Sequence, residues 1–111
     1  LDSMGHRFYH DCQEMDHACA VMDEMLAPFI PKWLAMGYEV IVTADHGQDA
    51  RGHHGGNSEL QRDVALYYFG PARGPAPDTL LDQLQLAPTI LTRLGAEIPP
   101  SMAARPFLPR D

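Results

Sequence analysis

Three short clusters of histidine and aspartate in this 111-residue sequence carry the side chains that bind metal ions. The first places Asp2 four residues before His6, and the second is the adjacent pair Asp45 and His46. The third is the run HHGG at residues 53–56. Carboxylate oxygens and imidazole nitrogens without thiolates suit zinc in a catalytic site, or manganese. The clusters therefore predict a site for divalent metal ions.

Two such ions about 4 Å apart can polarise a phosphoryl oxygen and stabilise the attacking and leaving oxygens of a displacement. The glycines beside the third cluster let the backbone turn sharply around a metal. Each cluster alone has a plainer interpretation, as a solvated turn or a chance pairing. The three clusters in this order favour the metal site, with a small phosphate ester as its substrate.

Two short buried strands are predicted to position these clusters. Residues 38–44 are apolar and β-branched, and they run directly into Asp45. This pattern is typical of a strand inside a parallel sheet, and residues 64–69 repeat it. In open α/β sheets, sites form outside the carboxyl ends of strands, so we expect the clusters to converge there.

Helices are predicted before and after the strands. Asp11 is expected to cap a helix that breaks near Ala27 and continues to Met36, because two prolines interrupt it. Residues 86–94 predict a further helix. The apolar side chains at helical spacing are expected to pack in the core; they are Cys12, Met15, Cys19, Met22, Leu26, Phe29, Ile30 and Trp33.

The remaining segments are predicted to be irregular. Residues 1–10 and 47–58 are expected to be loops, and the proline-rich tail from Ala96 is expected on the surface. Within the second loop, Asp49 and Glu59 are interpreted as solvated charges, or as carboxylates that orient the imidazoles.

Composition restricts the class of partner. The formal net charge is −7, which argues against generic binding to a nucleic-acid backbone. No apolar run approaches the roughly 20 residues of a membrane span. Cys12 and Cys19 are seven residues apart, about 10 Å along a helix, which is beyond disulfide reach. Two free thiols suit a reducing compartment and slightly favour the cytoplasm.

The motifs resemble a known family. The stretch VTADHG at residues 42–47, followed by GHHGG at 52–56, resembles the metal-binding core of the alkaline phosphatase superfamily. The nearest branch is the type I phosphodiesterase/nucleotide pyrophosphatase group, with the ethanolamine-phosphate transferases as relatives. The stretch DSMGH at residues 2–6 resembles an upstream metal-binding segment, and residues 86–95 resemble the closing helix, where Gln85 replaces an aspartate cap.

The resemblance implies two divalent metal ions, zinc or alternatively manganese. It implies one metal bound by Asp2, His6 and His54 and a second bound by Asp45 and His46. His54 is preferred over His53 because the family's ligand stands directly before a glycine.

The resemblance further implies that residues 1–111 are the C-terminal segment of one domain. Its fold class would be α/β, a mainly parallel sheet flanked by helices and incomplete in this chain. A Thr or Ser nucleophile would lie in the N-terminal half, so the isolated chain is expected to be inactive. The implied activity is hydrolysis of phosphodiester, phosphomonoester or pyrophosphate bonds.

Four alternatives stay open on the sequence. A sulfatase of the same superfamily would be expected to carry a Lys soon after the His-Gly pair, where Glu59 stands. A phosphomutase also stays open, because the motifs do not exclude one. A pseudoenzyme that holds a metal for structure only, and a binding module with incidental histidines, belong to other functional classes.

Overall fold

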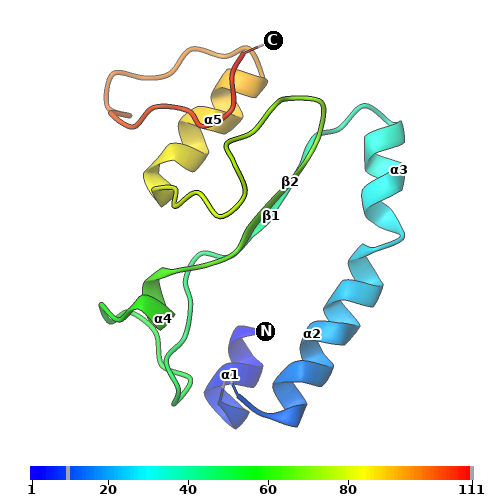
Figure 1. Ribbon diagram of the computed structural model, residues 1–111, viewed down its shortest axis with the longest axis vertical. Helices are drawn as coiled ribbons and strands as arrows, with labels where there is room; N and C mark the ends of the chain where they lie inside the picture. The colour runs from blue at the N-terminus through cyan, green and yellow to red at the C-terminus, as the bar shows by residue number, and fades with distance from the viewer. Residues whose placement is uncertain (10, 111) are drawn as a thin grey trace. The chain divides into compact units, whose positions relative to one another are not determined.

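The computed structural model describes residues 1–9 and 11–110 (Figure 1). The chain divides into two compact units, Leu1–Gly70 and Pro71–Asp111. Every side chain predicted to bind metal belongs to the first unit. Among the described residues, no helix combines the length and the hydropathy needed to cross a membrane.

The first unit opens with helix α1, Asp2–Phe8. The loop predicted over residues 1–10 is therefore wrong for residues 2–8, and residue 10 lies outside the described residues. Backbone hydrogen bonds close the helix, from Gly5 N–H to Leu1 O at 3.0 Å and from Tyr9 N–H to Gly5 O at 2.9 Å. Glycine and serine are poor helix formers, so the packing of buried Gly5 decides this segment rather than its propensity.

Helix α2, Gln13–Leu26, begins one residue later than predicted. Its N-cap is Cys12, whose sulfur accepts a hydrogen bond from Met15 N–H at 3.4 Å. The predicted cap at Asp11 is wrong because Cys12 has the extended backbone of an N-cap, with φ −155° and ψ 159°.

The break predicted near Ala27 is confirmed. Helix α3, Phe29–Ala35, follows it, and Gly37 ends that helix with φ +87°. The left-handed conformation suits a residue without a Cβ atom.

The apolar stripe along α2 and α3 is only partly covered: one of its eight side chains is buried, four are half-buried and three are exposed. The prediction that the stripe packs in the core is therefore wrong for most of it. Met15 is buried, with 9% of its surface exposed. Met22 and Phe29 are 42% and 47% exposed, and Cys19 is exposed. Helix α2 packs against α1 and α3, and these contacts leave Cys19, Met22 and Phe29 exposed.

Strands β1, Val40–Thr43, and β2, Leu66–Phe69, lie where both strands were predicted, but no residue of either strand is buried, so the predicted burial is wrong. They pair antiparallel, with Val40 opposite Phe69 and Thr43 opposite Leu66, so the predicted parallel arrangement is wrong for this pair. The chain leaves β1 and returns beside the same end through a loop and the short helix α4, Glu59–Arg62. A parallel neighbour would need a crossover back to the other end.

The second unit contains the 3₁₀ turn η1, Gln83–Gln85, and helix α5, Leu86–Arg93, which confirms the predicted last helix. An aspartate does cap this region, one turn earlier than Gln85. The side chain of Asp82 accepts from Leu84 N–H, and the Gln85 side chain returns to Asp82 N–H.

The tail does not lie wholly on the surface, which corrects the prediction from Ala96 onward. Leu108 is only 1% exposed. Phe107 N–H donates to the hydroxyl of Thr89 at 3.0 Å, and this hydroxyl donates to Gln85 O at 2.6 Å. Thr89 is fully buried, so these two bonds satisfy its hydroxyl and fix the tail against α5.

Candidate metal centre

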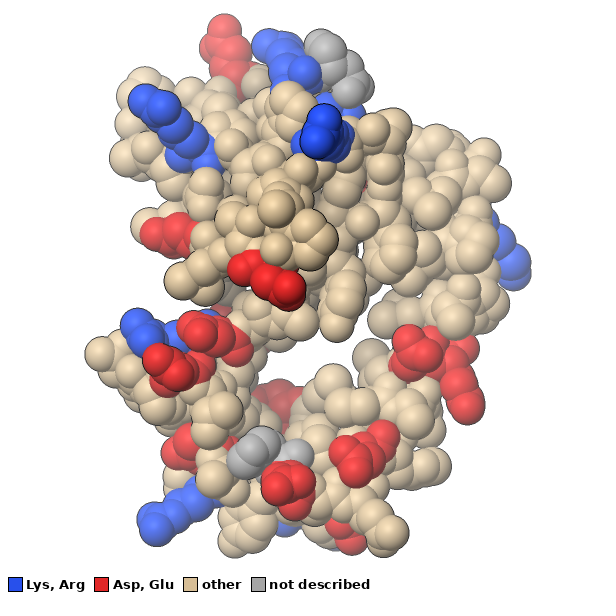
Figure 2. All heavy atoms as spheres, viewed as in Figure 1, with Lys and Arg blue, Asp and Glu red and all other residues tan. Residues whose placement is uncertain are grey.

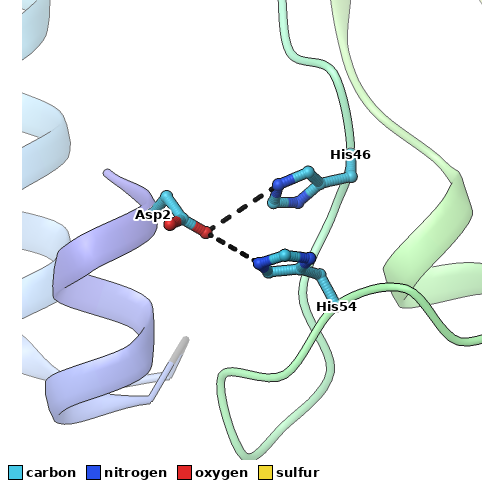
Figure 3. Close-up of side chains that lie close together, drawn as sticks. All are labelled: Asp2, His46 and His54. Carbon is cyan, nitrogen blue, oxygen red and sulfur yellow. Dashed lines mark ion pairs between the residues drawn. The ribbon is translucent and has the colours of Figure 1, made fainter.

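Three separate segments of the first unit bring the predicted metal-binding side chains together. Asp2 projects from the first turn of α1. His46 follows β1, and His54 lies in the loop before α4. Figure 3 shows the Asp2 carboxylate pointing from the helix toward both imidazoles on the facing segments. The expected convergence beyond the end of β1 is therefore present for these three side chains.

One carboxylate oxygen lies at the centre of this group. The distance from Asp2 Oδ1 to His54 Nε2 is 3.6 Å, and to His46 Nε2 it is 3.9 Å. His6 Nε2, one helical turn from Asp2, is 3.4 Å from the same oxygen. Asp2, His46 and His54 each offer a ligand atom, and these atoms all lie within 4.8 Å of one another.

These spacings fit a zinc ion. Zinc–nitrogen and zinc–oxygen bonds of about 2.0–2.1 Å in a tetrahedron place neighbouring ligand atoms about 3.4 Å apart. The two ion-pair distances of His54 and His46 to Asp2 Oδ1, 3.6 and 3.9 Å, exceed that spacing by only a few tenths of an ångström. A carboxylate with two imidazoles is also a ligand set that catalytic zinc sites use. The group can therefore hold a divalent cation after small side-chain adjustments.

The ring of His46 is held in one tautomer. Its Nδ1 lies 3.0 Å from the backbone oxygen of Gly47, and a carbonyl oxygen can only accept. In the neutral ring this contact favours the proton on Nδ1, which leaves the lone pair of Nε2 on the side of Asp2. A backbone carbonyl that fixes the non-ligating nitrogen is the usual support of a metal-binding histidine. The ring also stacks on His54, with centroids 3.9 Å apart and planes inclined by 21°.

The two adjacent histidines of the third cluster point to different partners. His54 faces Asp2, and 37% of its side chain is exposed. His53 is 68% exposed, and its Nδ1 lies 3.9 Å from the carboxylate of Asp49. The placement agrees with the choice of His54 over His53, although the identity of the ligand stays a prediction.

Asp45 joins the group through its neighbour. His46 Nε2 is 3.7 Å from Asp45 Oδ1 and 3.9 Å from Asp2 Oδ1. The Asp45 side chain is 90% exposed. His46 thus stands between the two predicted ligand sets instead of belonging only to the second, and the division into two metals stays a prediction.

Asp49 organises the loop that carries His54. Its Oδ1 accepts from the backbone N–H groups of Arg51 and His53, both at 2.9 Å. The bond from His53 is the main cause that lowers the pKa of Asp49 below its ordinary value of 3.8, while burial acts in the opposite direction. The carboxylate therefore shapes the loop and lies beside His53. Glu59, the other carboxylate considered, is exposed at the start of α4.

Gly52 lets the loop approach α1 closely. Gly52 has φ +72°, and a Cβ atom there would lie 1.9 Å from the backbone oxygen of Gly5. The close approach brings His54 within reach of Asp2. A further residue in this contact, Gln48, donates to Asp2 Oδ1 at 2.8 Å. No residue type or spacing singles Gln48 out in the sequence.

The surroundings are acidic. Residues 11–26 contain five carboxylates and no Lys or Arg, while α1 carries Arg7 and the loop carries Arg51. Figure 2 shows more acidic than basic side chains in the lower part of the view, where α1 and α2 lie. Such a surface attracts cations and repels phosphate, so a phosphate ester could approach only where bound metal reverses the local field.

No family model matches the sequence, and no solved structure matches it. The sequence is similar to two kinds of enzyme. The chain is 30% identical over 104 residues to human GPI ethanolamine phosphate transferase 3, catalytic subunit, across 89% of this chain and 10% of that protein. It is 30% identical over 117 residues to 2,3-bisphosphoglycerate-independent phosphoglycerate mutase of Aeromonas salmonicida, across 96% of this chain and 21% of the mutase. The chain is a distant homologue of these enzymes.

Both kinds of relative are alkaline phosphatase superfamily enzymes, so the resemblance is confirmed at the level of distant homology. The transferase of Schizosaccharomyces pombe adds a match of 31% identity over 105 residues. Enzymes of this superfamily use divalent metals, which agrees with the donor set around Asp2. The chain spans about a tenth of the transferases and about a fifth of the mutases.

Proposed function

We propose that the chain forms part of a two-metal hydrolase that cleaves phosphodiester bonds, within the phosphodiesterase/nucleotide pyrophosphatase branch. The observation that carries this proposal is the convergence of Asp2, His46 and His54 from three segments on one locus. A catalytic metal site needs such a set of nitrogen and oxygen donors without thiolates. The distant homology to enzymes of phosphate chemistry supports the same conclusion.

The chain's own residues supply the ligands. Asp2, His6 and His54 would hold one metal, and Asp45 and His46 would hold the second. When bound, zinc or manganese supplies the positive charge that draws a phosphate ester to an acidic surface and polarises its oxygens. The Gly47 carbonyl keeps the Nδ1 proton of His46 away from the site. A Thr or Ser outside these 111 residues provides the nucleophile, so residues 1–111 are one segment of a larger domain.

A phosphomutase is the second candidate, because the match to the Aeromonas salmonicida mutase covers 96% of this chain. A mutase returns the phosphoryl group to a hydroxyl of its substrate, whereas a hydrolase delivers it to water. The transferase relatives suggest a third acceptor, a hydroxyl on another molecule. The ligand set serves all three reactions, since they differ in the acceptor rather than in the metal site.

Bis-p-nitrophenyl phosphate tests the proposal. We expect no saturable release of nitrophenol from this substrate by the zinc-loaded 111-residue chain. The same chain joined to the segment that bears the nucleophile should turn over, and this turnover should be lost in His54→Ala. Saturable turnover by the isolated chain would contradict an external nucleophile. Activity of the joined protein on p-nitrophenyl sulfate alone would identify a sulfatase instead.

A further inference from the structure

The side chain of Gln48 forms a clamp on Asp2 from the opposite segment. Its amide nitrogen donates to Asp2 Oδ1 at 2.8 Å and to the backbone oxygen of Asp2 at 3.1 Å. The first of these acceptors is the oxygen that faces the ring nitrogens of His46 and His54. Gln48 therefore contacts the atom on which the candidate site converges.

The amide of Gln48 occupies space that Gly5 leaves open. A Cβ atom on Gly5 would lie 1.6 Å from Gln48 Oε1 and 2.9 Å from Gln48 Nε2. Gly5 is buried, and it sits on α1 three residues after Asp2. The helix thus fixes the amide twice, by hydrogen bonds at its first residue and by direct packing one turn later.

The hydrogen bonds from Gln48 can hold the Asp2 side chain in one rotamer. The carboxylate is 52% exposed, and an exposed aspartate on a first helical turn exchanges among rotamers. Each metal-binding event would then have to fix the side chain, which costs conformational entropy. A donor that holds the carboxylate in the binding rotamer beforehand removes part of that cost.

We propose that Gln48 is a positioning residue, which holds the Asp2 carboxylate toward His46 and His54 so that the group binds a divalent cation. This role rests on the proposed function, because it presupposes the metal site. Gln48 acts through Asp2 and need not touch the metal itself. Partners of this kind typically contribute 10–100-fold to metal affinity.

Two single substitutions remove the clamp in different ways. Gln48→Met keeps the length of the side chain and deletes its N–H donors. Gly5→Ala leaves Gln48 and Asp2 in the sequence but places a methyl group where the amide lies. Alanine is the better helix former, so a purely structural role of Gly5 in α1 predicts no loss of binding. We expect each variant to bind zinc about 10–100-fold more weakly than the parent chain.

The double variant Gly5→Ala/Gln48→Met provides the decisive comparison. Both changes break the same hydrogen bond, so the double variant should bind zinc about as weakly as either single variant. The absorption spectrum of bound Co²⁺ should shift equally in all three, because the carboxylate loses its orientation. Far-UV circular dichroism serves as the folding control, and Gly5→Ala provides the test if Gln48→Met does not fold.

The outcomes separate the two proposals. If the parent chain binds zinc and both single variants bind it equally well, the positioning role is wrong and the metal site stands. Losses that simply multiply in the double variant also contradict the shared clamp. If the parent chain binds no zinc at all, the metal site itself fails, and the role of Gln48 fails with it.

Discussion

Replacing His54 with alanine is expected to weaken zinc binding by at least about 100-fold, because loss of an outer-shell partner already costs 10–100-fold. The substitution removes one of three donors that lie within 4.8 Å of one another. It also removes the ring that stacks on His46. Two donors rarely suffice for a stable zinc site, which takes three or four protein ligands. Competition with a chromophoric zinc chelator measures the affinity over the required range.

His53→Ala is the matched control, since it removes the same side chain one position earlier. The His53 ring is 68% exposed and faces Asp49 instead of Asp2. We expect this variant to bind zinc within a few-fold of the parent chain. The opposite ranking, with His53→Ala binding more weakly than His54→Ala, would show that the ligand is misassigned.

Gly52→Ala is expected to destabilise the first unit by about 3 kcal/mol and to abolish tight zinc binding. Gly52 has φ +72°, which alanine adopts only with strain, and the added Cβ would lie 1.9 Å from the backbone oxygen of Gly5. The backbone oxygen of Gly5 cannot move away from the new Cβ atom as the end of a flexible side chain could. The loop must therefore move away from α1, which separates His54 from Asp2. Urea denaturation and zinc titration report the two effects.

Gly55→Ala separates the strain from the clash. Gly55 also has a positive φ, +86°, but a Cβ atom there would meet nothing within 4 Å. This variant should therefore lose only about 1–2 kcal/mol from the unfavourable backbone conformation. Equal destabilisation by the two alanines would mean that the contact between the loop and α1 contributes nothing.

The local elements could be predicted from the sequence where a single pattern decides them. The apolar run at residues 38–44 contains β1, and the prolines after Ala27 mark the break between α2 and α3. The pairing of β1 with β2 could not be predicted in the same way. Its direction depends on where the loop of residues 44–65 brings the chain back, and no residue type records that path.

The candidate site shows the same limit at the level of side chains. Residue types and the family resemblance pointed to Asp2, His46 and His54 before the structure placed them together. The clusters were predicted to converge, but the resemblance assigned His46 and Asp2 to different metals, and only the tertiary structure shows His46 Nε2 3.9 Å from Asp2 Oδ1. Gln48 carries no signal of its own, since a glutamine after a loop glycine is ordinary and only its distance to Asp2 gives it meaning.

Helix α1 and the partly covered apolar stripe of α2 and α3 depend on packing that the sequence does not record. Gly5 lies inside α1 against expectation because its missing side chain admits the Gln48 amide. Met22 and Phe29 follow the spacing of a core-facing helix, yet they remain exposed in the described residues. Periodicity identifies the apolar face of a helix but does not supply the surface that covers it.

X-ray absorption at the zinc edge of the metal-loaded 111-residue chain identifies the atoms that bind zinc. The proposed site predicts a first shell of nitrogen and oxygen at about 2.0–2.2 Å with imidazole scattering, from the ligands Asp2, His6 and His54 of one metal and Asp45 and His46 of the other. Sulfur at about 2.3 Å would instead place the zinc on a thiol, Cys12 or Cys19. That result, or a shell of water oxygens without imidazole, would contradict a metal centre at Asp2.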